Sequence, residues 1–116
     1  MNCTLLILTY KGKHHLEHLL PTVIKAIEKT PSYNIEVLIV DNGRDQAVKT
    51  FVEEYYPDFQ LSWSSKNDYL FSLNPYVASL KSEVVCILND DMRLHSEVFN
   101  QSLSFFEKDD QLFSVG

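Results

Sequence analysis

The chain has 116 residues, of which 45% are hydrophobic and 22% are charged, a composition typical of one globular domain. Sixteen acidic residues outweigh ten basic residues, which gives a formal net charge of −6. Binding to a nucleic-acid backbone needs concentrated positive charge, and the sequence has no cluster of lysine and arginine, so no nucleic-acid partner is expected.

Segments typical of strands and of helices alternate along the chain. Apolar runs or strict alternation predict strands at residues 3–10, 35–40, 59–64, 84–88 and 112–116. Apolar residues at helical spacing predict helices at residues 15–29, 46–56, 69–81 and 96–107. Pro21 is expected to kink the first helix or to begin a second one, and Asp45 is expected to cap the next helix.

This alternation indicates an α/β fold with a mostly parallel sheet and helices on both faces, a three-layer α/β/α arrangement in one Rossmann-like domain over residues 1–116. The first, second and fourth strands are predicted to be parallel and adjacent. The third strand alternates between apolar and polar residues and is predicted to lie outside the second, at the edge of the sheet.

Polar residues follow three of the predicted strands. In open α/β sheets, ligands bind beyond the carboxyl ends of the strands, so these residues are candidates for one shared site. The candidates are Thr9 and Tyr10, Asp41 and Asn42, and Asn89, Asp90 and Asp91. The sequence has neither G-x-G-x-x-G nor G-x-x-x-x-G-K-[ST], which excludes the usual dinucleotide and P-loop sites.

Each candidate also has a structural explanation. Asp90 and Asp91 on their own could be loop or capping residues, with odds about even against a metal-binding role. Asp41-Asn42-Gly43 on its own is typical of a simple turn. Three histidines near the start of the first predicted helix, at positions 14, 15 and 18, are better explained as a solvated helix end than as a metal site, because no carboxylate or cysteine lies in register with them.

Three stretches in order along the chain resemble the family 2 glycosyltransferases with the GT-A fold. The stretch "LILTYKGKHHLEHLLPTVI" resembles the family's opening strand, turn and first helix, and "EVLIVDNGRDQAVKTF" resembles its V-D-[ND]-G-S-x-D segment. The third stretch, "KNDYLFSLNPYVASLKSEVVCILNDD", is similar to its N-x-G segment and to the strand that ends in a D-x-D-type motif. The resemblance covers essentially the whole chain and implies the nucleotide-binding half of a GT-A enzyme.

The resemblance implies a site for the nucleoside of a nucleoside-diphosphate sugar. Thr9 and Tyr10 would lie near the nucleobase, and Asn42, or Asp41 beside it, would hydrogen-bond the edge of the base. Asp90 would lie near the ribose. The implied reaction is inverting transfer of a hexosyl group to a glycan or lipid-linked acceptor, as in polysaccharide biosynthesis.

The resemblance also implies a metal site. Asp91 would bind a divalent cation, Mn²⁺ or Mg²⁺, that bridges the two phosphates of the donor, with Asn89 in place of the first acid of the motif. These cations prefer oxygen ligands and stabilise the negative charge that develops on a diphosphate leaving group.

The chain departs from the family pattern at two loops. Tyr69 stands where the family has the glycine of its N-x-G segment, and residues 44–46 read Arg-Asp-Gln where the family has Ser-x-Asp. The family continues beyond the equivalent of residue 116 into an acceptor-binding half that supplies the catalytic base. We therefore expect a truncated donor-binding part that is inactive alone, with an exposed sheet edge that favours self-association.

A second class of protein remains open from the residues alone. A non-catalytic α/β binding module, such as a receiver-like regulatory domain, also carries acidic residues at strand ends. Such a domain places paired acids after its first strand, where this chain has Thr9 and Tyr10. No predicted segment is long enough to span a bilayer, and two cysteines in apolar runs predict reduced thiols in a cytoplasmic protein, including one at the inner face of the membrane.

Overall fold

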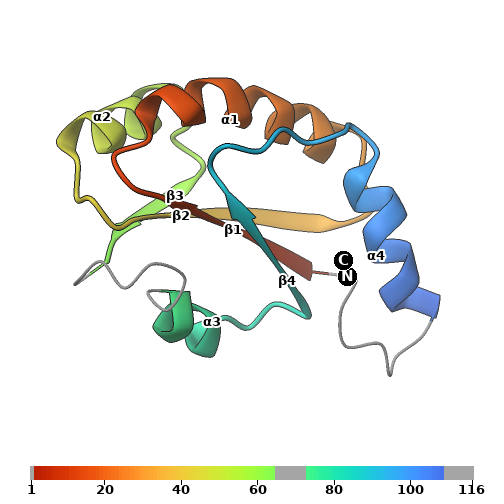
Figure 1. Ribbon diagram of the computed structural model, residues 1–116. Coiled ribbons are helices and arrows are strands. Elements are labelled where there is room, and N and C mark those ends of the chain that lie inside the picture. Colours follow the sequence, from red (N-terminus) through yellow and green to blue (C-terminus); the bar gives the residue numbers. More distant parts are fainter. Residues whose placement is uncertain (1, 65–72, 109–116) are drawn as a thin grey trace.

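The computed structural model describes residues 2–64 and 73–108, in which strands and helices alternate (Figure 1). The strands are β1 (Asn2–Thr9), β2 (Asn34–Asp41), β3 (Gln60–Trp63) and β4 (Val84–Asn89). The helices are α1 (Lys13–Glu28), α2 (Gln46–Tyr55), α3 (Asn74–Ser79) and α4 (Val98–Lys108). The strand predicted at 112–116 and the beginning of the helix predicted at 69–81 lie outside the described residues.

The four described strands form one parallel sheet in the order β3-β2-β1-β4. This order confirms the predicted α/β class, the adjacency of the first, second and fourth strands, and the edge position of the third. Within the described sheet β4 is the other outer strand, and its Ile87 is 53% exposed. Self-association through such an edge stays a prediction.

The two faces of the sheet carry different side chains because successive residues of a strand point to opposite sides. Odd-numbered residues of β1 and β2, such as Leu5 and Ile39, pack in the main core with α1, α2 and α4. Even-numbered residues, such as Leu6 and Val40, pack on the other face in a smaller core that includes Tyr76 of α3. Figure 1 shows α1 and α2 above the sheet and α3 below it, which confirms the predicted three layers.

Helix α1 runs without interruption through Pro21, so the alternative of a second helix starting there is wrong. A proline inside a helix leaves the carbonyl four residues earlier without its usual donor. That residue is Glu17, and both it and Pro21 are exposed, so water can satisfy the carbonyl. The opposite side of α1 supplies buried leucines to the main core, which stabilises the helix despite the proline.

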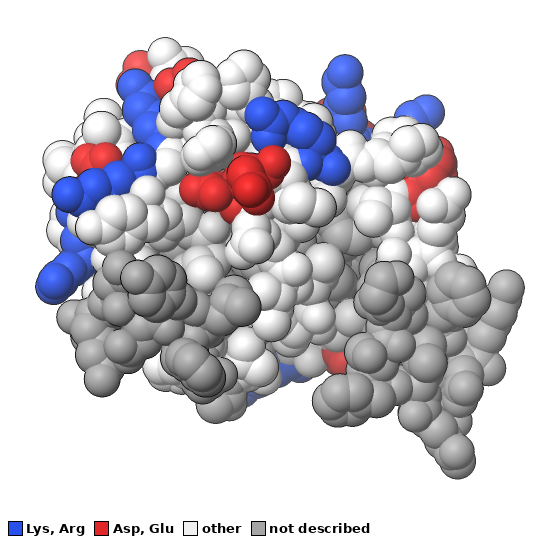
Figure 2. Space-filling view, viewed as in Figure 1, with Lys and Arg blue, Asp and Glu red and all other residues white. Residues whose placement is uncertain are grey.

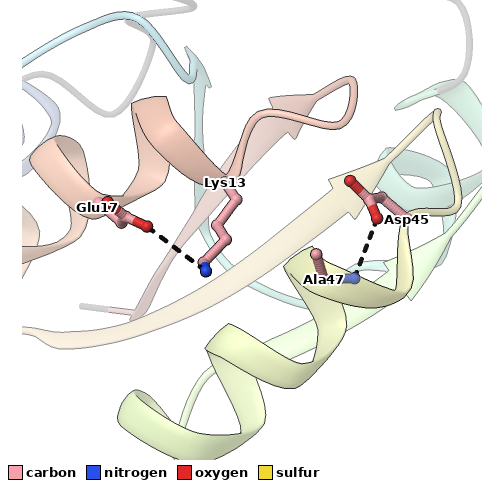
Figure 3. Close-up of polar contacts among 4 residues, drawn as sticks. All are labelled: Lys13, Glu17, Asp45 and Ala47. Atoms are coloured by element: carbon pink, nitrogen blue, oxygen red, sulfur yellow. Dashed lines mark hydrogen bonds and ion pairs between the residues drawn. The ribbon is translucent and has the colours of Figure 1, made fainter.

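Helix α2 begins where the sequence predicts. Asp45 is its N-cap, and its Oδ1 accepts a hydrogen bond of 3.0 Å from the backbone amide of Ala47 (Figure 3). The same figure shows Lys13 at the start of α1, with its ammonium 3.8 Å from the carboxylate of Glu17. Both helices therefore begin beside the carboxyl ends of β1 and β2. None of the helices in the described ranges is long and apolar enough to cross a membrane.

Candidate functional site

The register of the sheet places the predicted site residues at one edge, which we call the rim. Thr9 at the end of β1 pairs with Asp41 at the end of β2, and Leu8 pairs with Asn89 at the end of β4. Asp41 also pairs with Trp63 at the end of β3. The polar segments that follow the strands therefore meet at the carboxyl edge, as predicted from the parallel topology.

Asp90 is anchored inside the rim. Its Oδ2 accepts a hydrogen bond of 2.6 Å from the hydroxyl of Thr9, which is 2% exposed. The backbone of Gly12, the residue before α1, lies against this pair. A Cβ at Gly12 would overlap Asp90 Oδ2 and Thr9 Oγ1 and would lie 3.2 Å from Asp90 Cγ, so only glycine leaves room for the contact.

Asp91 differs from its neighbour because its side chain is exposed and makes no hydrogen bond or ion pair with another described residue. Asn89, the last residue of β4, is exposed as well. Figure 2 shows an acidic patch over the carboxyl end of β4, with basic side chains on both sides of it. Two adjacent carboxylates thus have two environments, one directed into the rim and one directed to solvent.

Asp41 is completely buried, and its carboxylate accepts three backbone hydrogen bonds. Oδ1 accepts from the amides of Lys11, at 3.1 Å, and Gly43, at 2.9 Å. Oδ2 accepts from the amide of Asp45, at 2.9 Å. The carboxylate therefore joins the loop after β1 to the loop after β2.

Asn42 is held by both neighbouring strands. Its backbone amide donates to the carbonyl of Thr9 at 2.9 Å, and its Oδ1 accepts a hydrogen bond of 2.6 Å from the hydroxyl of Ser64. Both Asn42 and Ser64 are buried, at 6% and 4% exposed. Because its backbone amide and its side-chain oxygen both have partners, Asn42 is held in a fixed position at the rim.

Tyr10 and Lys11 form the outer wall of the rim next to Thr9. The ring of Tyr10 is 57% exposed, and the ammonium of Lys11 lies 5.8 Å from its centroid. Lys11 has a φ of 51°, in the left-handed region that residues with a side chain rarely adopt. An exposed aromatic ring beside a cation can receive a flat, electron-rich ligand group.

Asn89 at the end of β4 and Asp91 after it could supply two oxygen ligands to a hard divalent cation that takes the rest of its coordination from a bound ligand and water. The described residues include no group of three or more histidine, cysteine, aspartate or glutamate side chains able to hold a metal. Asp91 offers a carboxylate directed to solvent, and Asn89 offers an amide oxygen nearby in the chain. Mg²⁺ in nucleotide sites typically uses one or two carboxylates, with phosphates and water as the other ligands.

Three residues of the rim were not predicted from the sequence. Gly12 and Lys11 follow a strand end and look like an ordinary turn, whereas Ser64 looks like the last residue of an edge strand. The spacing of Asp41 and Gly43 is a signal that could have been used, because an aspartate often accepts a hydrogen bond from the amide two residues later. The contact to Lys11 depends on the packing of two loops and has no local signal.

Glycosyl transferase family 2 matches residues 4–116 of the chain. No match was found among curated protein sequences. Among solved structures, S. aureus TarS 1-349 is similar, with a TM-score of 0.74 and 22% identity over 93% of this chain. TarS 1-349 in complex with UDP-GlcNAc is similar with a TM-score of 0.70 and 22% identity, also over 93% of this chain.

A mannosyltransferase, PcManGT from Pyrobaculum calidifontis in complex with GDP-Man and Mn²⁺, is also similar. The TM-score is 0.69, with 18% identity over 90% of this chain. The chain covers 33% of TarS 1-349, and 32% both of its UDP-GlcNAc complex and of PcManGT, so it spans about a third of their length. At these identities the likeness establishes the fold, which is that of the GT-A glycosyltransferases.

Proposed function

The chain belongs to glycosyl transferase family 2, and on that premise we propose that its rim binds a nucleoside-diphosphate sugar together with a divalent cation. The observation that carries the proposal is the division between Asp90, anchored to the hydroxyl of Thr9, and Asp91, directed to solvent. Support for the ligand class comes from the similar structures, which contain UDP-GlcNAc in one case and GDP-Man with Mn²⁺ in another.

We assign the nucleoside to the side of the rim formed by the loops after β1 and β2. The exposed ring of Tyr10 would lie against the nucleobase, next to Thr9, and Asn42 would hydrogen-bond the edge of the base. Asp90 would accept a hydrogen bond from a ribose hydroxyl, since a carboxylate can accept more bonds than the one donated by Thr9. These groups orient the donor before any reaction begins.

Asp91 and Asn89 would hold Mn²⁺ or Mg²⁺ against the donor's phosphates. When bound, the cation would stabilise negative charge on the departing nucleoside diphosphate. The protein's part is to keep the carboxylate of Asp91 exposed at the point where the phosphates would arrive. Asp90 supports this arrangement because its bond to Thr9 fixes the backbone that leads into Asp91.

The reaction that this site serves is, in our proposal, inverting transfer of a hexosyl group to a glycan or lipid-linked acceptor in polysaccharide biosynthesis. Such a transfer needs a general base within hydrogen-bond reach of the acceptor hydroxyl. We assign the acidic residues of the described rim to the donor side and to the loops, and none of them to that base. We place the reaction on the cytoplasmic side, where the free Cys3 and Cys86 would stay reduced.

The experiment that tests the proposal is calorimetric titration of UDP and GDP with and without Mn²⁺. Wild-type protein should bind at least one of them, and Mn²⁺ should strengthen the binding. Asp91→Ala should lose this gain, about tenfold or more in affinity, with little effect on folding because the side chain is exposed.

The matched control is Asp58→Ala, which also removes an exposed carboxylate. Asp58 lies in the turn before β3, at the opposite end of that strand from the rim, so its removal should leave nucleotide binding unchanged. If Asp91→Ala and wild type show equal, Mn²⁺-enhanced affinity, the metal assignment is wrong. If wild type binds neither nucleotide, the donor site itself is wrong.

A further inference from the structure

We propose that Asp41 is a positioning residue, which clamps the loops after β1 and β2 together and so holds Tyr10 and Lys11 in place at the rim. The proposal rests on the proposed function for the identity of the ligand, a nucleoside diphosphate. It differs from the role implied by family resemblance, in which Asp41 is an alternative to Asn42 for contacting the base.

The hydrogen bonds of Asp41 account for both of its oxygen atoms. Two of the three donors, the amides of Gly43 and Asp45, belong to the loop that Asp41 itself begins. The third donor, the amide of Lys11, is 30 residues away in the chain and belongs to the loop after β1. A carboxylate that is 0% exposed and receives three amides is a structural acceptor with no surface for a nucleobase.

Backbone conformation shows what the clamp maintains. Lys11 has a φ of 51°, and its own amide donates to Asp41. Arg44 has a φ of 48° and lies between Gly43 and Asp45, whose amides also donate to Asp41. A residue with a side chain stays in the left-handed region only where its surroundings hold it there. The bond from Lys11 to Asp41 supplies such a constraint, and Tyr10 is the residue immediately before it.

Close packing of the two loops supports the same conclusion. A Cβ at Gly43 would overlap Lys11 Cγ and would lie 3.0 Å from the backbone nitrogen of Lys11 and 3.3 Å from Asp41 Oδ1. The loop after β1 can therefore approach the carboxylate only because position 43 has no side chain. Asp41 and Gly43 therefore act together to hold Lys11 in place, one as hydrogen-bond acceptor and the other by leaving room for it.

Amide hydrogen exchange tests the clamp without any ligand. In wild type, the amides of Lys11, Gly43 and Asp45 should exchange slowly. In Asp41→Ala all three should exchange about tenfold faster or more, relative to core amides of β1 such as Ile7, because each loses a charge-assisted bond. Asp41→Asn keeps one carbonyl oxygen as an acceptor, so it should protect some of these amides, but not all three.

Nucleotide binding tests the positioning role, with UDP and GDP in the presence of Mn²⁺ as probes. Affinity should fall by about tenfold or more in Asp41→Ala and recover in part in Asp41→Asn. Trp63, the only tryptophan in the chain, pairs with Asp41 in the sheet and offers a fluorescence signal for these titrations. Asp58→Asn is the matched control and should change neither measurement.

The two measurements separate the clamp from the proposed function. Unchanged exchange of the Lys11 amide in Asp41→Ala, or equal acceleration of all amides including that of Ile7, would overturn the clamp. Faster loop exchange with unchanged nucleotide affinity would overturn the positioning role. If wild type binds neither UDP nor GDP, the proposed function fails, while the exchange data still decide whether the clamp exists. If Asp41→Ala does not fold, Asp41→Asn provides both comparisons.

Discussion

Replacing Gly12 with alanine should disrupt the rim through a single added methyl group. Gly12 has a φ of −96°, outside the left-handed region that favours glycine, so the expected effect comes from the contacts of the added methyl group. The added Cβ would overlap Asp90 Oδ2 and Thr9 Oγ1. The hydroxyl of Thr9 and the carboxylate of Asp90 must both turn away from the added methyl group, which breaks the Thr9–Asp90 hydrogen bond.

The size of the effect follows from the bond that is lost. A hydrogen bond to a charged group contributes about 1.5–3 kcal/mol to stability. Alanine in place of glycine also stabilises the fold by about 0.4–1 kcal/mol, because it reduces the conformational entropy of the unfolded chain. Gly12→Ala should therefore lower the free energy of unfolding by about 0.5–2.5 kcal/mol, or lower Tm by about 2–10 °C for a chain of this size.

Urea unfolding followed by Trp63 fluorescence measures this change, and calorimetry with UDP and Mn²⁺ measures its effect on binding. The control is the same substitution in a Thr9→Ala/Asp90→Ala background, where both overlapping side-chain atoms are absent. There Gly12→Ala should cost less than half as much, because the collision has been removed. An equal cost in the two backgrounds would refute the argument that Gly12 is needed to admit the Thr9–Asp90 contact.

Two further predictions concern stability. Asp45→Ala should lower the free energy of unfolding by about 1 kcal/mol through loss of the cap on Ala47, and Asp45→Ser should restore most of it, as measured by urea unfolding. Burial, with Cys86 nearby, raises the pKa of the Cys3 thiol to about 12 from 9.0. The unfolded chain ionises first, so the free energy of unfolding should fall as the pH rises from 9 toward 12, and less steeply in Cys3→Ala.

Sequence periodicity was sufficient for most of the fold, because burial on both faces of a parallel strand leaves a recognisable apolar run. β1 and β2 lie within one or two residues of their predicted ranges, and α2 starts after its predicted cap. The proline in α1 was misjudged as a possible helix boundary because its effect depends on tertiary packing. A proline on the exposed side of a helix is tolerated when water can reach the carbonyl four residues earlier and the other side of the helix is buried.

The sequence was sufficient to predict which strand ends form the rim, but not which hydrogen bonds join their residues. Parallel topology alone brings the carboxyl ends of neighbouring strands together, so Thr9, Asn42 and Asp91 could be grouped from the sequence. Pairing Thr9 with Asp90 required the register between β1 and β4, which periodicity does not specify across an α-helical crossover. The burial of Asp41 required the approach of a loop from elsewhere in the chain, which is a property of packing.

Strand alternation explains why two carboxylates stand next to each other at the end of β4. Cys86 and Leu88 point to the face of the sheet that α1 covers, so Asp90, the next even-numbered residue, points to that face as well. There it accepts the hydrogen bond from the hydroxyl of Thr9. The residue that follows is exposed. In our proposal Asp90, held by Thr9, serves the nucleoside and Asp91, open to solvent, serves the phosphates, so the strand end carries two acids in sequence, and solvent at the rim weakens their mutual repulsion.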